Sequence, residues 1–266
     1  MRPYIGVTGF TTPQEIRAAI RFFGRATTHQ LMVGVLMSSK TLRGETNKWP
    51  RRYPRVSAIH DLFVKSPAVF NVIHFATDDK RRLGRDLMHI VADVAGPHLH
   101  GFQLNVCWPD IGQIKAFHDA TAGQYRIVLQ VGGKALDEVG HSPLELAQRV
   151  ATYRDVAHCV LLDQSGGHGK PLNVLTLSAY MESIQAHNPH FQIGVAGGLC
   201  AESVFALHPL MQKYPGTSID AEGRLRDEVD DDMDMIRVLA YLSRAQRVVA
   251  GHPDPAEVSR LLCGNG

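Results

Sequence analysis

The sequence alternates short apolar segments with segments of helical pattern, and this alternation constrains the fold more than any other feature. Eight apolar segments, rich in Val, Ile, Leu and Phe, lie at residues 4–10, 31–37, 68–75, 101–108, 126–133, 159–164, 192–199 and 217–223. Strands that alternate with helices pair in parallel through crossover connections. Eight such units in 266 residues match the α/β class and its (β/α)8 TIM barrel, which typically needs about 250 residues. We therefore predict one barrel domain over residues 1–266, closed by a short extra helix at 255–262.

An open, doubly wound sheet is the competing architecture. It would place a G-x-G-x-x-G turn after its first strand, and "GVTGFTTP" at 6–13 is not that motif. No linker-like stretch divides the chain. The sequence therefore favours the barrel.

Several helices carry recognisable start signals. "TPQE" at 12–15 is a capping box with Pro13 at the first helical position, and "SPLE" at 142–145 repeats the pattern. The acidic run "DEVDDDMD" at 227–234 precedes the apolar face of 235–249, where acids favour a helix start. A solvated first helical turn explains that run better than a metal site.

Composition and cysteine spacing indicate an ordinary cytoplasmic globular protein. Hydrophobic residues make up 44% and charged residues 20% of the chain, and the net charge of +2 is too small to indicate nucleic acid or a membrane surface. No apolar run approaches the roughly 18 residues of a membrane span, and the N-terminus reads as a strand. Four scattered cysteines form no C-x-x-C pair, so we expect reduced thiols and no metal site. Oligomeric state is left undecided.

In a (β/α)8 barrel the chemistry lies on the loops that follow the strands. That rule places a set of polar residues and glycines on the functional face: Thr8, Lys40, His74, Asp78, Asn105, Cys107, Gln130, Asp163, His168, Gly197, Gly198, Asp220 and Glu222. His98, His100 and His158 precede strands instead, so we expect them at the opposite end in structural roles.

The segment "VLLDQSGGHGKPLN" at 160–173 places Asp163 at the end of an apolar strand, under a glycine-rich loop. Partial burial raises a carboxyl pKa, which suits a general acid or base near neutral pH. Gly166 and Gly167 would let a substrate approach closely. An aspartate that only caps the amides of the loop is the alternative, and the residues alone leave both open.

Two further loops point to an anionic ligand. Gly197 and Gly198 precede a predicted helix at "CAESV", and bare amides at a helix start can hold a phosphate. Barrels commonly share such a site with the loop after the eighth strand, here "DAEGRL" with Asp220 and Gly223. Glycines that serve only the turn geometry are the alternative.

The predicted loop at 40–55 is long and basic. It holds six basic residues, among them Lys40 and Arg43, against the single acid Glu45. A cationic loop of this length is typical of a lid or binding loop for an anionic substrate, although a solvated loop without a specific role fits equally well.

These motifs occur in the order found in phosphoribosylanthranilate isomerase, a (β/α)8 barrel, and the resemblance covers most of the chain. "GVTGFT" lies where the family has lysine-x-Cys-Gly-x-Thr. "FQLNV" resembles its Gln-Leu-His-Gly strand, with Gln103 kept and Asn105 in place of the histidine. "LLDQSGGHGK" and "AGGLCAESV" resemble its sixth and seventh strand ends, and "DAEG" corresponds to Asp-x-Ser-Ser-Gly.

The resemblance implies a cofactor-free isomerisation of a phosphorylated sugar amine, as in tryptophan biosynthesis. Asp163 matches the family's general acid, and Gly197 and Gly198 match its phosphate loop. Thr8 occupies the position of the general-base cysteine, although a hydroxyl is far too weak a base at neutral pH. His74, His168 or Cys107 could replace it, and His168 could swing in from the glycine loop.

Other positions depart from the family pattern. Ala221 and Glu222 replace the phosphate-binding serines, and "KPLNV" replaces Phe-Asp-Trp. Lys40 and Arg43 are candidates for gripping a substrate carboxylate. Two alternatives follow: a barrel enzyme for a polar substrate that need not be phosphorylated, with Asn105, Gln130 and Glu222 at its mouth, or a ligand-binding paralogue without catalysis.

Overall fold

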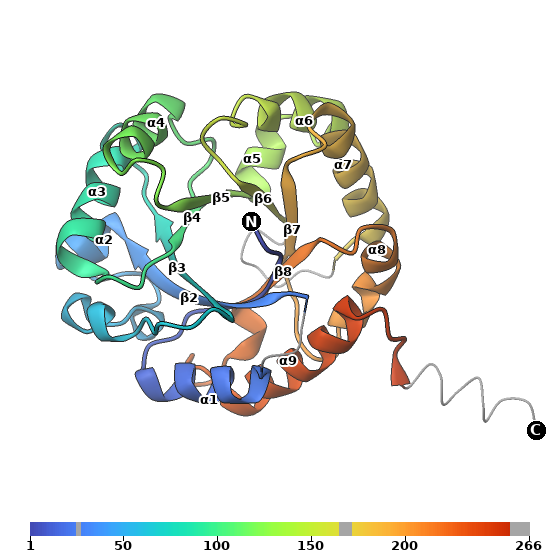
Figure 1. The fold of residues 1–266 in the computed structure, drawn as a ribbon, viewed down its shortest axis with the longest axis horizontal. Coiled ribbons are helices and arrows are strands. Elements are labelled where there is room, and N and C mark those ends of the chain that lie inside the picture. The colour runs from blue at the N-terminus through green and yellow to red at the C-terminus, as the bar shows by residue number, and fades with distance from the viewer. Residues whose placement is uncertain (25–27, 165–171, 256–266) are drawn as a thin grey trace, which may run out of the picture.

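The computed structural model describes residues 1–24, 28–164 and 172–255, and its strands close into a single barrel. The strands follow one another around it in chain order, all pairs are parallel, and β8 pairs with β1. Helices surround the barrel on its outside (Figure 1). The predicted (β/α)8 fold is confirmed.

Each predicted strand is present, although several end earlier than predicted. The strands are β1 (Tyr4–Thr8), β2 (Gln30–Ser38), β3 (Val69–Ala76), β4 (Gly101–Asn105), β5 (Arg126–Val131), β6 (Cys159–Asp163), β7 (Gln192–Ala196) and β8 (Ser218–Ala221). Because β7 and β8 are short, Gly197 and Gly198 lie in a loop and Gly223 begins a 3-10 helix, rather than lying in strands.

The helices, in chain order, include short 3-10 turns and one π-helical turn. The α-helices are α1 (Pro13–Phe23), α2 (Ser39–Leu42), α3 (Leu83–His89), α4 (Ile111–Ala120), α5 (Gly133–Glu138), α6 (Pro143–Ala151), α7 (Val174–His187), α8 (His208–Lys213) and α9 (Met235–Val249). The 3-10 helices are η1 (Pro50–Arg52), η2 (Val56–Asp61), η3 (Lys80–Arg82), η5 (Val204–Leu207) and η6 (Gly223–Leu225), and η4 (Ile90–Val94) is the π-helical turn. The predicted helix at 255–262 lies almost wholly outside the described residues.

Two of the predicted caps are present in the structure. Thr12 accepts from the amide of Glu15, and the Glu15 carboxylate accepts from the amide of Thr12, which completes the capping box of α1. Ser142 accepts from the amide of Glu145 at the start of α6. Each cap satisfies backbone donors that the first turn would otherwise leave unpaired.

Two apolar layers hold the barrel together. The larger joins the outward faces of the strands to the helices. A separate cluster fills the barrel: Tyr4, Met32, Phe70, Val72, Val128, Cys159, Leu161 and Ala196. Because strand side chains alternate between the two faces, this filling fixes which polar residues face inward at the ends of the strands.

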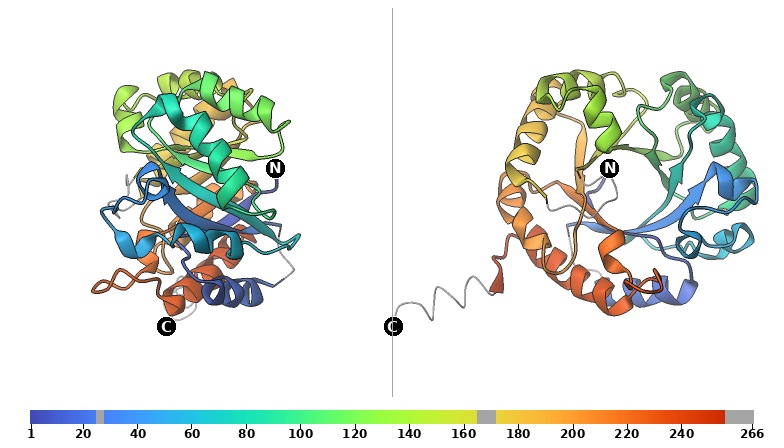
Figure 2. Two further views of the ribbon diagram at one scale, coloured as in Figure 1. Left: turned by 90° about the vertical axis from the view of Figure 1, so that its left-hand side faces the viewer. Right: turned by 180° about the vertical axis from the view of Figure 1, so that it is seen from behind.

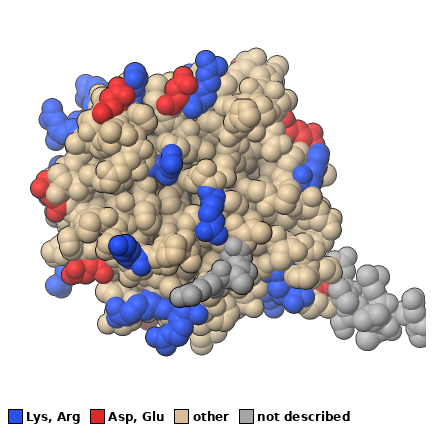
Figure 3. Space-filling model, viewed as in Figure 1, with Lys and Arg blue, Asp and Glu red and all other residues tan. Residues whose placement is uncertain are grey.

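The N-terminus lies at the end of the barrel where the strands begin, as the three views of Figures 1 and 2 show together. There the ring nitrogens of His100 and His158 accept from the amides of Asn71 and Ile127. The structural role predicted for these two histidines is confirmed. Figure 3 shows that Lys and Arg on this face are scattered rather than joined in one basic surface.

Candidate functional site

A layer of buried polar side chains lies inside the barrel where the strands end. It comprises Thr8, His74, Gln103, Gln130, Asp163 and Asp220, each at most 9% exposed. They come from β1, β3, β4, β5, β6 and β8. His74, Gln130 and Asp163 each stand two residues beyond a side chain of the apolar filling, so the same alternation that packs the barrel turns them inward. We call the whole set the polar layer.

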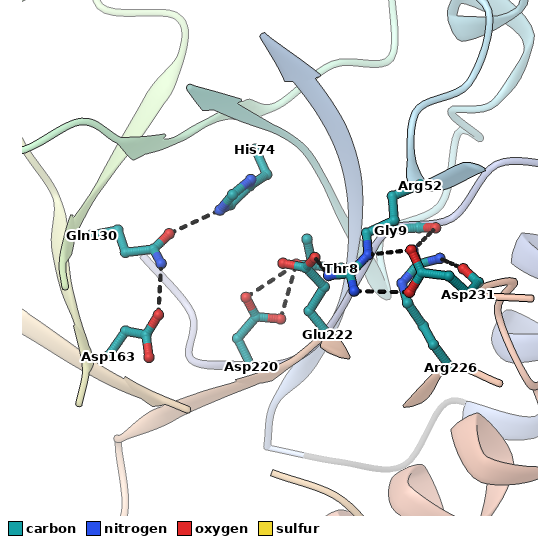
Figure 4. A network of polar contacts seen from close by, with 10 residues as sticks. All are labelled: Thr8, Gly9, Arg52, His74, Gln130, Asp163, Asp220, Glu222, Arg226 and Asp231. Atoms are coloured by element: carbon teal, nitrogen blue, oxygen red, sulfur yellow. Dashed lines mark hydrogen bonds and ion pairs between the residues drawn. The ribbon is translucent and has the colours of Figure 1, made fainter. Parts of the chain in front are cut away.

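Hydrogen bonds join the polar layer into one connected chain between its two carboxylates. Gln130 Nε2 donates to Asp163 Oδ2 at 3.0 Å, and Gln130 Oε1 accepts from Gln103 Nε2 at 3.2 Å and from His74 Nε2 at 2.9 Å (Figure 4). Gln103 Nε2 also donates to Asp220 Oδ2 at 3.1 Å. The two glutamine amides therefore hold both carboxylates in fixed positions relative to one another.

The hydroxyl of Thr8 is bonded to the other side of Asp220. Thr8 Oγ1 lies 3.0 Å from both Asp220 Oδ1 and Oδ2 and donates to this carboxylate. Thr8 is therefore engaged as a hydrogen-bond donor to a buried carboxylate.

Burial sets the protonation of Asp220. Loss of hydration raises the pKa of this carboxyl to about 7, and the charges of Glu222 and Asp163 add to the increase, while the bonds from Gln103 and Thr8 oppose it. A carboxyl that titrates near neutral pH can accept a proton and return it in one catalytic cycle. Asp220 was predicted only as part of the anion loop, so its place in the polar layer is a new assignment.

Two glycines make room for this carboxylate and its partner. A Cβ on Gly6 would lie 2.5 Å from Asp220 Oδ1, and a Cβ on Gly34 would lie 2.5 Å from Thr8 Oγ1. Neither glycine has a backbone angle that requires glycine, so space around the polar layer explains them. Glycine in the interior of a buried strand often marks a place where other atoms come close to the backbone. Gly6 and Gly34 are therefore the features of the sequence that could have revealed the polar layer.

A second polar cluster ties the predicted basic loop to the segment before α9. Arg52 donates to both carboxylate oxygens of Asp231 at 2.8 Å and to Glu222 Oε1 at 3.0 Å. Buried Arg226 donates to the carbonyl oxygens of Asp231 and Gly9 at 2.8 Å. Figure 4 shows this cluster beside Asp220, with Glu222 between them. We call these contacts the Arg52 clamp.

The clamp corrects two predictions. The loop at 40–55 is only partly a free cationic surface, because three of its six basic residues are paired: Arg43 with Glu45, and Arg51 and Arg52 with acids of the 230–232 run. Of the acidic run, only Asp234 caps α9. Asp230, Asp231 and Asp232 instead pair with arginines of the basic loop. The basic residues of one loop and the acidic residues of the other form ion pairs with each other. Neither loop, taken alone, reveals these pairs. Lys40 lies exposed on α2 and has no ion pair within the described ranges.

The predicted anion cradle after β7 lacks its helix. Gly197 and Gly198 have φ angles of 108° and 64°, which favour glycine for the turn itself. Residues 201–203 form a turn and 204–207 a 3-10 helix, and Ser203 Oγ accepts from the amide of Cys200. The prediction of a helix that starts at "CAESV" is therefore wrong. The Ser203 side chain binds the Cys200 amide at a turn, and helical residues begin only at 204.

The remaining predicted residues are dispersed. Asn105 is exposed at the end of β4, and Cys107 donates to Glu138 Oε1 at 3.2 Å, away from the polar layer. Burial raises the pKa of the Cys107 thiol, and its bond to Glu138 adds to the increase, which makes it a poor base. Gly166, Gly167 and His168 lie outside the described residues.

A cavity of about 450 Å³ lies outside the barrel wall rather than over the polar layer. It is lined by Trp108, Glu138, Val139, Glu145, Gln148, Arg149 and Thr152. Neither Asp163 nor Asp220 lines this cavity, so we place the candidate site at the polar layer, where Asp220 and its hydrogen-bond partners converge.

Residues 1–24, 28–164 and 172–255 contain neither a metal-binding cluster nor a membrane-spanning helix. No three His, Cys, Asp or Glu side chains of this part gather closely enough to hold a metal ion. None of its helices is long and apolar enough to cross a membrane.

Comparison with known proteins identifies the fold. No family model and no curated protein matches this sequence. Among solved structures, the catalytic domain of a hyperthermophilic chitinase from Pyrococcus furiosus is 10% identical, with a TM-score of 0.56 over 94% of this chain and 97% of that one. Ribulose-1,5-bisphosphate carboxylase/oxygenase from Pyrococcus horikoshii is 11% identical, with a TM-score of 0.57 over 98% of this chain and 62% of that one. The chain shares the barrel fold of these enzymes, and identity this low extends no further than the fold.

Proposed function

We propose that this barrel is a cofactor-free acid–base isomerase similar to phosphoribosylanthranilate isomerase, acting on a small, anionic sugar amine. The observation that carries the proposal is the pairing of Asp163 and Asp220 within one hydrogen-bonded layer, with Asp220 titrating near pH 7. An isomerisation of this kind moves protons without net oxidation, so one donor and one acceptor are sufficient.

In the proposed reaction Asp163 donates a proton to the ring oxygen of the substrate. The ring carbon–oxygen bond breaks, and the nitrogen lone pair forms a carbon–nitrogen double bond. Asp220 then takes the proton from the adjacent carbon, which gives an enol amine. The enol amine tautomerises to the ketone by losing its hydroxyl proton and gaining a proton at the carbon that bears the nitrogen. Over the cycle Asp163 regains a proton and Asp220 releases the one it took, so both carboxyls return to their starting states. Thr8, Gln103 and Gln130 hold the carboxyls in place for these steps.

The surroundings of Glu222 support an anionic substrate. Its carboxylate is bonded to Arg52 rather than left as an unpaired charge, so it opposes a phosphate at the loops after β7 and β8 less than the sequence suggested. In this proposal Gly197, Gly198 and Gly223 border the phosphate, and Lys40 contributes positive charge at the rim. Arg43, bound to Glu45, has no role in it.

A polar substrate without phosphate is the second candidate. The observation that favours it is the missing helix after β7, together with Ala221 and Glu222 where the family has hydroxyl donors. A phosphate would then find backbone amides but no helix start to hold it.

The test is to follow the loss of anthranilate fluorescence when the protein is mixed with phosphoribosylanthranilate. We expect turnover that Asp163→Asn and Asp220→Asn each reduce by about 10²–10⁴, the typical contribution of a positioned acid or base. Asp155→Asn, which alters an exposed carboxylate, should leave it unchanged. A folded protein that shows no turnover at high concentration contradicts the proposal and favours a changed substrate or a ligand-binding role.

The pH profile then assigns the roles. If Asp220 is the proton acceptor, the rate falls as the pH drops below about 7, because the carboxyl becomes protonated. A rate that falls above that pH would make Asp220 the donor and contradict the assignment.

A further inference from the structure

The orientation of the two glutamine amides decides which hydrogen-bonding groups the polar layer can offer a ligand. Gln130 directs its NH2 group at the Asp163 carboxylate and therefore its oxygen at Gln103 and His74. The reverse orientation would set the Gln130 NH2 group against the Gln103 NH2 group, which also donates to Asp220, and that contact is repulsive. The network thus assigns both amides.

This orientation leaves buried acceptors without donors. Because Gln130 Oε1 can only accept, His74 donates from Nε2, and in the neutral imidazole Nδ1 is then an acceptor. His74 Nδ1 and Gln103 Oε1 are buried and have no hydrogen-bond partner among the residues that the structure describes, and their side chains are 4% and 1% exposed. Figure 4 shows the His74 ring with one nitrogen on Gln130 and the other turned away.

The donors of the layer, by contrast, are engaged. The Thr8 hydroxyl is bound to Asp220, and the Gln103 NH2 group is bound to both Gln130 and Asp220. The layer therefore offers acceptors and negative charge. A buried acceptor without a donor carries its full desolvation penalty, and a ligand that brings N–H or O–H groups removes it.

We infer that the polar layer binds the amine-bearing, hydroxylated part of the substrate, with Gln103 Oε1 and His74 Nδ1 as the groups that recognise its donors. An anionic group at this depth would meet Asp163, Asp220 and Glu222, so the anionic part of the same molecule stays at the rim, on the side of Lys40. The inference builds on the proposed function, because it names the end of the substrate that enters the barrel. Its test measures binding and needs no turnover.

The test compares two ligands of equal size. In 1,4-dideoxy-1,4-imino-D-ribitol the ring carries an amine, whereas 1,4-anhydro-D-ribitol has an ether oxygen at the same place. Isothermal titration calorimetry of the wild-type protein at neutral pH should give at least about tenfold tighter binding of the amine, the effect of one lost hydrogen bond to a charged group. Inorganic phosphate should not displace it.

Two variants connect this preference to the named atoms. Gln103→Met and His74→Phe keep the volume and remove the acceptors, so each should reduce the preference for the amine to about threefold or less. Gln30→Met, at the opposite end of the barrel, is the matched control. Circular dichroism selects the folded variants, and if neither folds, the wild-type comparison alone decides.

Equal affinity for the two ligands, no binding of the amine at millimolar concentration, or displacement by phosphate would each overturn the inference. So would an unchanged preference in both folded variants. Amine binding without turnover would reject the proposed isomerisation and keep the inference. Turnover without a preference for the amine would reject the inference and keep the proposed isomerisation.

Discussion

Thr8 Oγ1 lies 3.0 Å from each carboxylate oxygen of Asp220, across the seam where β8 closes on β1. The two residues are 212 positions apart in the chain, and the last strand pairing of the barrel brings them together. This contact gives Thr8 its place in the structure, because its hydroxyl is the donor that holds the Asp220 carboxylate.

The first prediction concerns the pH dependence of stability. The pKa of Asp220 is raised from 3.8 to about 7 in the folded protein, so between these values the folded state holds a proton that the unfolded state releases. Stability should therefore fall as the pH rises from about 4 to about 7 and then level off, by at most about 4 kcal/mol. Urea unfolding at a series of pH values measures this.

Asp220→Asn is the variant that isolates this contribution. It removes the titrating group, so the decrease between pH 4 and pH 7 should shrink, and the variant should gain stability over the wild type at pH 8 more than at pH 4. Parallel curves for the two proteins would contradict the assignment of the shift to Asp220.

A second prediction concerns the hydroxyl of Thr8. Its hydrogen bond lowers the pKa of Asp220 against the effect of burial, so Thr8→Val should raise that pKa above about 7 while nearly preserving the shape of the side chain. Titration of the aspartate carboxyl carbon signals by NMR would follow the shift directly. Thr152→Val, on an exposed turn, is the control, and a pKa that stays or falls in Thr8→Val refutes the role given to the bond.

Gly6 supplies the third prediction. In Gly6→Ala the new Cβ would meet Asp220 Oδ1 at 2.5 Å and Met32 Cε at 2.7 Å, so the barrel filling must move. We expect a loss of about 1–3 kcal/mol in unfolding free energy, typical of overpacking, and a displaced Asp220.

Gly133→Ala is the matched control, because a Cβ there meets nothing within 4 Å and the residue begins α5. It should be neutral or stabilise the protein by up to about 1 kcal/mol. If chemical denaturation gives the same change in unfolding free energy for Gly6→Ala and Gly133→Ala, a glycine is not needed at position 6 for the space it leaves.

The Arg52 clamp gives the fourth prediction. The Arg52 side chain is 16% exposed and holds two carboxylates, whereas that of Arg51 is 54% exposed. Arg52→Ala should cost about 1–3 kcal/mol, since it leaves Glu222 and Asp231 without their partner in a half-buried place. Arg51→Ala should cost less than about 1 kcal/mol, as exposed pairs do.

Thermal unfolding of the two arginine variants at low and high salt compares these effects. The cost of Arg51→Ala should vanish in high salt and that of Arg52→Ala should largely persist, because partly buried pairs are screened less. Equal costs in the two adjacent positions would show that the clamp does not fix the loop.

The sequence by itself determined the elements and their order. Short apolar segments, helical patterns and caps such as Thr12 with Glu15 involve only a few neighbouring residues, so they could be recognised locally. Eight alternating units then favoured the closed barrel. The place of Asp163 in the barrel could also be predicted, because a carboxylate at the end of a buried strand must lie where the strands of the barrel end.

Only the tertiary structure decided what these residues do together. Closure of the barrel brings Thr8 to Asp220, the pleat turns Gln103 and Gln130 toward both carboxylates, and the loop of Arg52 meets the acids at 230–232. These pairings join residues that are distant in sequence, and their energies depend on burial, which local patterns do not specify. The same dependence explains why the ion pairs between the basic loop and the acidic run, and the missing helix after β7, could not be predicted from each segment alone.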